Sequence, residues 1–145
     1  MGICRQRMGG DKMKIYVACH CQEEAKKVAS RLSSAGYEIT SSWLQEDMNK
    51  KLSDAERQNI ALKDVKEVES SDCLVMIGAP TGCHVPGGKH VEAGVAIANA
   101  KPILLLGRKE NIFYWHPLVF QFDDINKLLD QIEIFNANKK FLRNG

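Results

Sequence analysis

The chain has 145 residues, 44% hydrophobic and 26% charged, a balance typical of one ordinary globular domain. Its net charge is +2, with both signs spread along the sequence, which argues against a nucleic acid as the main partner. The longest apolar runs are far too short to cross a bilayer, so no membrane partner is expected. Five cysteines are an odd number, and a chain of this length needs no disulfides to fold. We therefore expect free thiols and a reducing, cytoplasmic setting.

The chain divides into three parts by composition. Residues 1–12 are basic and lack an apolar stretch, so we expect a flexible N-terminal extension rather than a signal peptide. A single domain is predicted over residues 13–137, and a C-terminal tail over residues 138–145.

Strand and helix patterns alternate along this domain. Short apolar runs rich in β-branched residues indicate strands, and apolar residues at helical spacing indicate helices. The predicted elements, in chain order, are a strand over 14–19, a helix over 22–35, a strand over 37–43, a helix from a Ser53 capping box to about residue 70, a strand over 72–78, a helix over 89–100, strands over 101–106 and 119–122, and a helix over 124–136. This order predicts an α/β fold, namely a three-layer α/β/α sandwich of flavodoxin or Rossmann type. Its five-stranded parallel sheet has the order 2-1-3-4-5, with the strand over 119–122 at an edge.

In folds of this type the ligand binds beyond the carboxyl ends of the strands. The loops that follow residues 18, 43, 78 and 106 are therefore the candidate site. They carry a set of polar, glycine and aromatic residues that includes Cys19, His20, Trp43, Gly87, Gly88 and Asn111.

The turn at Gly87 and Gly88 and the helix after it have two interpretations each. The glycines either let the backbone approach a phosphate or sugar hydroxyl at the helix start, or simply form a tight turn. Glu92 is either a carboxylate stabilised by the helix dipole or a nucleophile or base directed into the cleft. Asp64 lies on one helix face with Arg57, and a solvated surface pair is the plain explanation for both.

The same end of the sheet also carries residue types that bind metals. Cys19, His20, Cys21, Cys83 and His84 would approach one another if the first and third strands are neighbours. Their Cys-x-Cys and Cys-His spacings are not those of a structural zinc site. We therefore predict no metal and no cofactor.

Several segments together resemble the nucleoside 2-deoxyribosyltransferase superfamily, which includes 2'-deoxynucleoside 5'-phosphate N-hydrolases and pyrimidine-nucleotide N-glycosidases. The similarity spans residues 14–132, and the Glu-x-Gly-x-Ala element after a glycine loop is its most specific part. The segments that carry it are residues 14–18, 57–64, 71–75, Gly88 with 91–96, and 101–103. The Pro-Gly-Gly turn also resembles the phosphoribohydrolases of the lysine-decarboxylase-like family, but their second Gly-Thr pair is missing here.

The resemblance implies an enzyme that acts on the N-glycosidic bond of a nucleoside or nucleotide. Glu92 would attack the anomeric carbon, and Asp64 would position the sugar or protonate the leaving base, so that the (deoxy)ribosyl group passes to another base or to water. The substrate-binding residues would be Cys19, His20, Trp43, Gly87, Gly88, His90 and Asn111. A homodimer or larger homo-oligomer is also implied, with contacts from residues 113–115 and Phe135.

One departure from the family keeps a second function open. The loop after the first strand usually carries a glycine or Gly-Arg element, and here it reads Cys19-His20-Cys21. The alternative is a non-catalytic nucleotide-binding module of the same fold.

Overall fold

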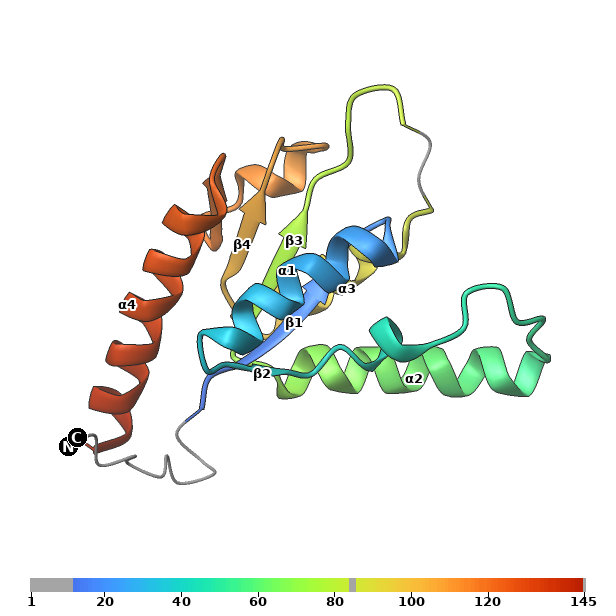
Figure 1. Ribbon diagram of the computed structural model, residues 1–145, viewed down its shortest axis with the longest axis horizontal. Coiled ribbons are helices and arrows are strands. Elements are labelled where there is room, and N and C mark those ends of the chain that lie inside the picture. The colour runs from blue at the N-terminus through green and yellow to red at the C-terminus, as the bar shows by residue number, and fades with distance from the viewer. Residues whose placement is uncertain (1–11, 84–85, 145) are drawn as a thin grey trace.

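The computed structural model describes residues 12–83 and 86–144 (Figure 1). Within these residues, five strands form one parallel sheet in the order β2-β1-β3-β4-β5. The strands are β1 (Lys14–Ala18), β2 (Glu38–Ile39), β3 (Cys73–Ile77), β4 (Ile103–Leu106) and β5 (Val119–Phe122). The α-helices are α1 (Gln22–Ser34), α2 (Asp54–Ser70), α3 (Gly88–Ala98) and α4 (Ile125–Asn144). The predicted fold class and strand order are confirmed.

The alternation of side chains along each strand creates the three layers. On one face of the sheet, Ile15 and Val17 of β1 belong to the core cluster that contains residues of α1 and α4. On the other face, Tyr16 and Ala18 belong to the cluster that contains residues of α2 and α3. Consecutive residues of a strand point to opposite faces, so the buried residues 15–18 of β1 require a helix layer on each side.

The loops after β3 and β4 approach each other closely at two glycines. A Cβ at Gly78 would lie 3.0 Å from the backbone nitrogen of Arg108, and Gly107 has a φ of +118°. Both positions therefore require glycine, for space at the first and for backbone conformation at the second. This contact brings the loop before α3 next to the loop that carries Glu110.

The second predicted strand, over 37–43, is wrong over most of its length. The ladder ends at Ile39, and the chain turns into a 3₁₀ helix, η1 (Ser42–Gln45). The side-chain amide of Gln22 donates hydrogen bonds to the carbonyl oxygens of Trp43, Leu44 and Glu46. The Trp43 indole also donates to the carbonyl of Val17, over 2.9 Å. These tertiary hydrogen bonds favour a turn where the local alternation favours a strand.

The limits of two other predicted elements also change. The closing helix does not end near residue 136 but continues to Asn144, and Lys139 on its extra length forms an ion pair with Asp72. The strand predicted from residue 101 starts at Ile103, because the Lys101 backbone NH donates to the Ala96 carbonyl oxygen and closes the preceding helix instead. The Ser53 capping box is confirmed, since its side chain accepts from the Glu56 NH and the Glu56 carboxylate accepts from the Ser53 NH.

Two further structural features bear on function. A 3₁₀ helix, η2 (Ile112–Trp115), lies inside the predicted loop over 107–117. No helix in the described part of the chain is both long and apolar enough to cross a membrane.

Candidate active site

A cavity of about 900 Å³ lies between α2, α3 and the segment 43–52, beside the carboxyl end of β1. Figure 1 shows α2 and the segment that precedes it extending away from the sheet. Their lining residues form the outer wall of the cavity, and those of α3 form the inner wall. The predicted site residues that line this cavity are Cys19, His20, Trp43, Asp64, Gly88 and Glu92. The structure thus brings six sequence-separated residues together at one end of the sheet.

Much of the cavity wall is apolar. The apolar lining residues on or beside α2 and α3 include Met48, Leu52, Ile60, Val65, Val91 and Val95. Apolar walls that surround a few converging polar groups are the usual form of a small-molecule site. A ligand with a largely apolar surface matches this wall.

Glu92 enters the cavity from the second turn of α3, where Tyr16 holds its carboxylate. The Tyr16 hydroxyl donates a hydrogen bond to Oε2 of Glu92. Burial raises the pKa of Glu92 to about 7, the bond from Tyr16 opposes this rise, and the negative charges of Asp64 and Glu67 add to it. Burial and the same carboxylate raise the pKa of Tyr16 far above its usual value, so the phenol stays a proton donor. Glu92 can therefore exist in either protonation state near neutral pH.

Asp64 faces the same cavity from α2 and has an unsatisfied acceptor. Its Oδ1 atom is buried and has no hydrogen-bond partner among the described residues. Burial raises the pKa of Asp64 to about 6, while Lys63 lowers it and Glu46 and Glu67 raise it further. An unpartnered buried polar atom is costly, and in an enzyme site it is a reason to expect a ligand group there.

The start of α3 leaves open space at its glycines. Gly87 is the N-cap residue and has a φ of −78°, which every residue type adopts. A Cβ at Gly87 or Gly88 would meet no other atom within 4 Å. Neither steric crowding within the chain nor, at Gly87, the backbone conformation therefore requires a glycine here. Their small size keeps the space in front of the helix start free.

The lysine beside these glycines is already neutralised. Lys89 is only 3% exposed, and its ammonium group forms an ion pair with Glu110. The carboxylate of Glu110 also accepts from the Ala79 NH, over 3.4 Å. A buried cation with a hydrogen-bonded partner stabilises the loop arrangement and leaves little charge for a ligand.

The remaining predicted substrate-binding residues lie outside the cavity lining. Nδ1 of His90 forms a hydrogen bond with the Tyr114 hydroxyl, and the two ring centroids are 5.6 Å apart. The Asn111 side chain accepts from the Phe113 NH over 3.0 Å and caps η2. Gly87 adjoins the lining residue Gly88 but does not itself line the cavity. Their roles in substrate binding stay predictions.

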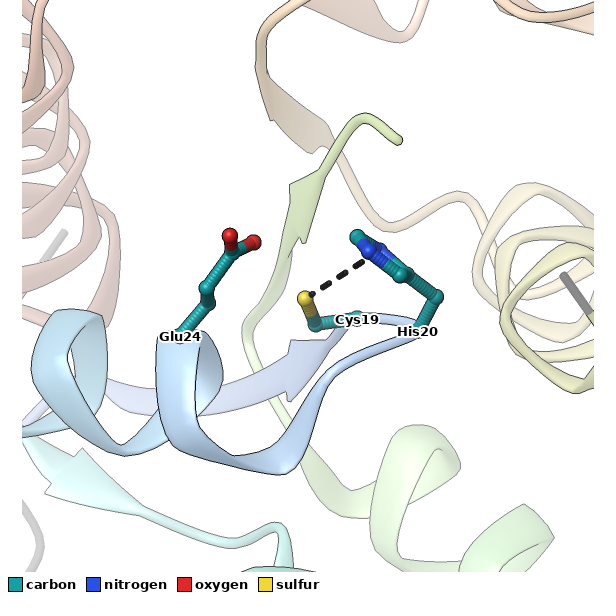
Figure 2. Close-up of side chains that lie close together, drawn as sticks. All are labelled: Cys19, His20 and Glu24. Carbon is teal, nitrogen blue, oxygen red and sulfur yellow. Dashed lines mark hydrogen bonds between the residues drawn. The ribbon is translucent and has the colours of Figure 1, made fainter. Parts of the chain in front are cut away.

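A group of possible metal ligands lies at the edge of the site and includes Glu24, which the Cys and His spacings do not indicate. Cys19, His20 and Glu24 each place one ligand atom within 4.8 Å of the other two (Figure 2). Cys83 is exposed and is not part of this group, and His84 lies outside the described residues.

The sequence interpretation missed Tyr16, the acidic neighbours Glu46 and Glu67, and the Lys89–Glu110 pair. The alternation along β1 predicts that Tyr16 points to the opposite face of the sheet from Ile15 and Val17. It does not reveal which helix covers that face, so it does not predict the contact between Tyr16 and Glu92. No local pattern indicates the Lys89–Glu110 pair, since its members are 21 residues apart.

Comparisons with known proteins identify a matching family and similar folds. The family model described as nucleoside 2-deoxyribosyltransferase matches residues 15–116. The solved structure of the CMP N-glycosidase BcmB of Clostridium botulinum is similar at a TM-score of 0.53 and 18% identity, covering 83% of this chain and 98% of that one. The 2-deoxyribosyltransferase of Bacillus psychrosaccharolyticus is similar at a TM-score of 0.62 and 23% identity, covering 79% of this chain and 89% of that one. A search of curated proteins finds no match.

At these identities the two solved structures support the fold, whereas the family model covers well over half of the sequence. With the parallel sheet order and the match over residues 15–116, the chain belongs to the nucleoside 2-deoxyribosyltransferase family.

Proposed function

We propose that this protein cleaves the N-glycosidic bond of a nucleoside and transfers the (deoxy)ribosyl group to a second base or to water. The observation that carries the proposal is the convergence of Glu92 and Asp64 on one largely apolar cavity, with Glu92 held by Tyr16. Family membership supports the reaction class. The glutamate nucleophile is our own assignment.

In the proposed first step, an oxygen of ionised Glu92 attacks the anomeric carbon, and the bond from that carbon to the base nitrogen breaks. The bonding electrons go to the base, and protonated Asp64 supplies the proton that the base needs. In the second step, water or another base attacks the glycosyl ester, Asp64 accepts its proton, and Glu92 is released as a carboxylate. Because the pKa of Glu92, about 7, lies above that of Asp64, about 6, ionised Glu92 beside protonated Asp64 is about a tenth as populated as the opposite arrangement, and the reaction proceeds through this minor form. A carboxylate and a carboxylic acid act together in the same way in glycoside hydrolysis.

Charge in the cavity favours a substrate without a 5'-phosphate. The two lysines that line the described part of the cavity are each paired with a carboxylate, Lys50 with Glu56 and Lys89 with Glu110. The carboxylates that also line it are Glu46, Asp47, Glu56, Asp64 and Glu92. A phosphate dianion would enter a region of like charge with no described unpaired cation to receive it. We therefore propose an unphosphorylated nucleoside as the substrate.

We also propose a cytoplasmic homo-oligomer. Phe113 and Trp115 of η2 are 71% and 64% exposed, whereas Tyr114 between them is buried. Two large exposed aromatic side chains on one short element are typical of an interface. Phe135, the other predicted contact, packs edge-on against Phe120 within the same chain.

The function is tested by following base release chromatographically over a panel of 2'-deoxynucleosides, ribonucleosides and their 5'-monophosphates, each with and without an acceptor base. We expect release from unphosphorylated nucleosides, and loss of at least about 10³-fold in Glu92→Gln and Glu92→Ala, as for removal of a nucleophile. Glu133→Gln, on the exposed face of α4, is the matched control and should retain full activity. Base release at an unchanged rate in both Glu92 variants would refute the assignment.

The panel also tests the alternative function. The replacement of the usual strand-one loop by Cys19-His20-Cys21 is the observation that favours a non-catalytic nucleotide-binding module. Tight calorimetric binding of a nucleotide, with no base released from any substrate over hours, would select that alternative.

A further inference from the structure

Three side chains that the glycosidic mechanism does not use converge where β1 ends and α1 begins. Figure 2 shows Cys19 and His20 projecting from the loop after β1 and Glu24 from the first turn of α1. One ligand atom of each residue lies within 4.8 Å of the other two. They are a thiol sulfur, an imidazole nitrogen and a carboxylate oxygen.

The spacing of the first two atoms is close to that of a zinc complex. Sγ of Cys19 and Nδ1 of His20 are 3.8 Å apart. A tetrahedral zinc ion with ordinary bonds to sulfur and nitrogen holds these two atoms about 3.5 Å apart. Glu24 is exposed and makes no hydrogen bond or ion pair within the described chain, so its carboxylate can close onto an ion without breaking a contact.

Local contacts account for parts of this group. Glu24 lies in the first turn of α1, where the helix dipole stabilises a carboxylate. Sγ of Cys19 accepts a hydrogen bond from the Cys21 NH over 3.3 Å and shares another with Nδ1 of His20. None of these contacts requires the carboxylate of Glu24 to face the same point as the sulfur and the imidazole. Their donor types also select the ion, because calcium and magnesium prefer oxygen ligands whereas zinc accepts sulfur, nitrogen and oxygen together.

We propose that Cys19, His20 and Glu24 bind one zinc ion, with water as the fourth ligand. On binding, the Cys19 thiol gives up its proton to the solvent as the sulfur–zinc bond forms, and neutral His20 donates the lone pair of a ring nitrogen. Three protein ligands and one exchangeable position describe an open site rather than a closed structural one.

The site has a consequence for the cavity. Cys19 and His20 also line the cavity that Glu92 and Asp64 line. A zinc ion held by them, with its bound water, fixes these two side chains and takes up space at that wall. We expect zinc to weaken nucleoside binding at least tenfold and a chelator to restore it. This consequence rests on the proposed function, whereas zinc binding itself does not.

The test is calorimetry of the full chain, freed of metal and kept reduced, titrated with zinc chloride. Cobalt titration followed by the thiolate-to-cobalt absorption band is the second readout. Cys19→Ser and Glu24→Gln remove ligands. Their matched controls are Cys83→Ser, which removes an exposed thiol outside the group, and Glu23→Gln, which changes the neighbouring carboxylate on the same turn.

We expect one zinc per chain, affinity reduced at least tenfold in both ligand variants, and no change in either control. The thiolate-to-cobalt absorption band should disappear in Cys19→Ser and remain in Cys83→Ser. No zinc binding, or equal losses in ligand and control variants, would overturn the site. If zinc binds as expected but nucleoside affinity does not change, the site stands and its link to the cavity is refuted.

Discussion

Replacement of Tyr16 by phenylalanine isolates one hydrogen bond to the proposed nucleophile. The Tyr16 ring is fully buried in the core, and its hydroxyl donates to Glu92. A hydrogen bond to a charged acceptor contributes about 1.5–3 kcal/mol, and this bond favours the ionised form of Glu92. Its loss should therefore raise the pKa of Glu92 by about 1–2 units, from about 7 to about 8–9.

The consequence for catalysis is a smaller ionised fraction of the nucleophile. Near about pH 6.5, kcat/KM should fall about 10- to 100-fold in Tyr16→Phe. The assay pairs a pH series of base release with carbon-13 NMR titration of the glutamate carboxyl groups. Tyr114→Phe is the control, because it also removes a buried hydroxyl but one that contacts His90. The reasoning is refuted if the Glu92 pKa stays near 7 in Tyr16→Phe, or if both variants shift it equally.

Four further outcomes are expected. Because Glu92 and Asp64 titrate near 7 and 6, kcat/KM should be bell-shaped with an optimum at about pH 6.5, and a flat profile from about pH 5 to 8 would contradict this. The folded-state pKa of Glu92 lies above its ordinary value of 4.5, so the free energy of unfolding should fall as pH rises between these values. Glu92→Gln should therefore raise Tm at about pH 8 more than at about pH 4, and equal shifts would argue against a raised pKa. Ser53→Ala should cost about 1 kcal/mol in urea unfolding because it removes the capping box, whereas Ser53→Thr should cost less. Light scattering should show a homo-oligomer that dissociates when Phe113 and Trp115 are both changed to serine, and a native monomer would contradict the proposed interface.

The sheet could be predicted because its determinants are local and agree with one another. The strand beginning at Cys73 is an uninterrupted buried run, and the helix that precedes it starts at a capping box readable from four residues. The second strand could not be predicted in the same way. Residues 40–43 have strand-like alternation, but the Gln22 amide holds this stretch as a turn, and no local sequence pattern reveals a partner so distant along the chain.

In the candidate site, too, features set by neighbouring residues could be predicted and features set by distant residues could not. The position of Glu92 in a helix that follows a glycine turn could be predicted, because the turn and the helix start are adjacent in sequence. The phenol that holds this carboxylate comes from β1, 76 residues earlier, and only the packing of α3 on that face brings the two together. The protonation behaviour of Glu92 follows from this burial and from Asp64, so it could not be inferred from the sequence.

The outer wall of the cavity, on α2, packs less against the core than the inner wall, on α3. Glu92 lies on a helix whose Ala93 and Ala96 are buried against the sheet, so its position is set by the core. Asp64 lies on α2, whose one buried residue is Val68, near the carboxyl end of the helix. Before Val68, α2 forms ion pairs of partly exposed side chains with the preceding segment, Lys63 with Glu46 and Glu56 with Lys50. Exposed pairs contribute little to stability, so we expect this part of α2 to separate from α3 at a lower free-energy cost than unfolding of the core. A ligand that contacts both walls would supply the packing that the outer wall lacks. It would also set the distance between the two carboxyl groups that the proposed reaction needs.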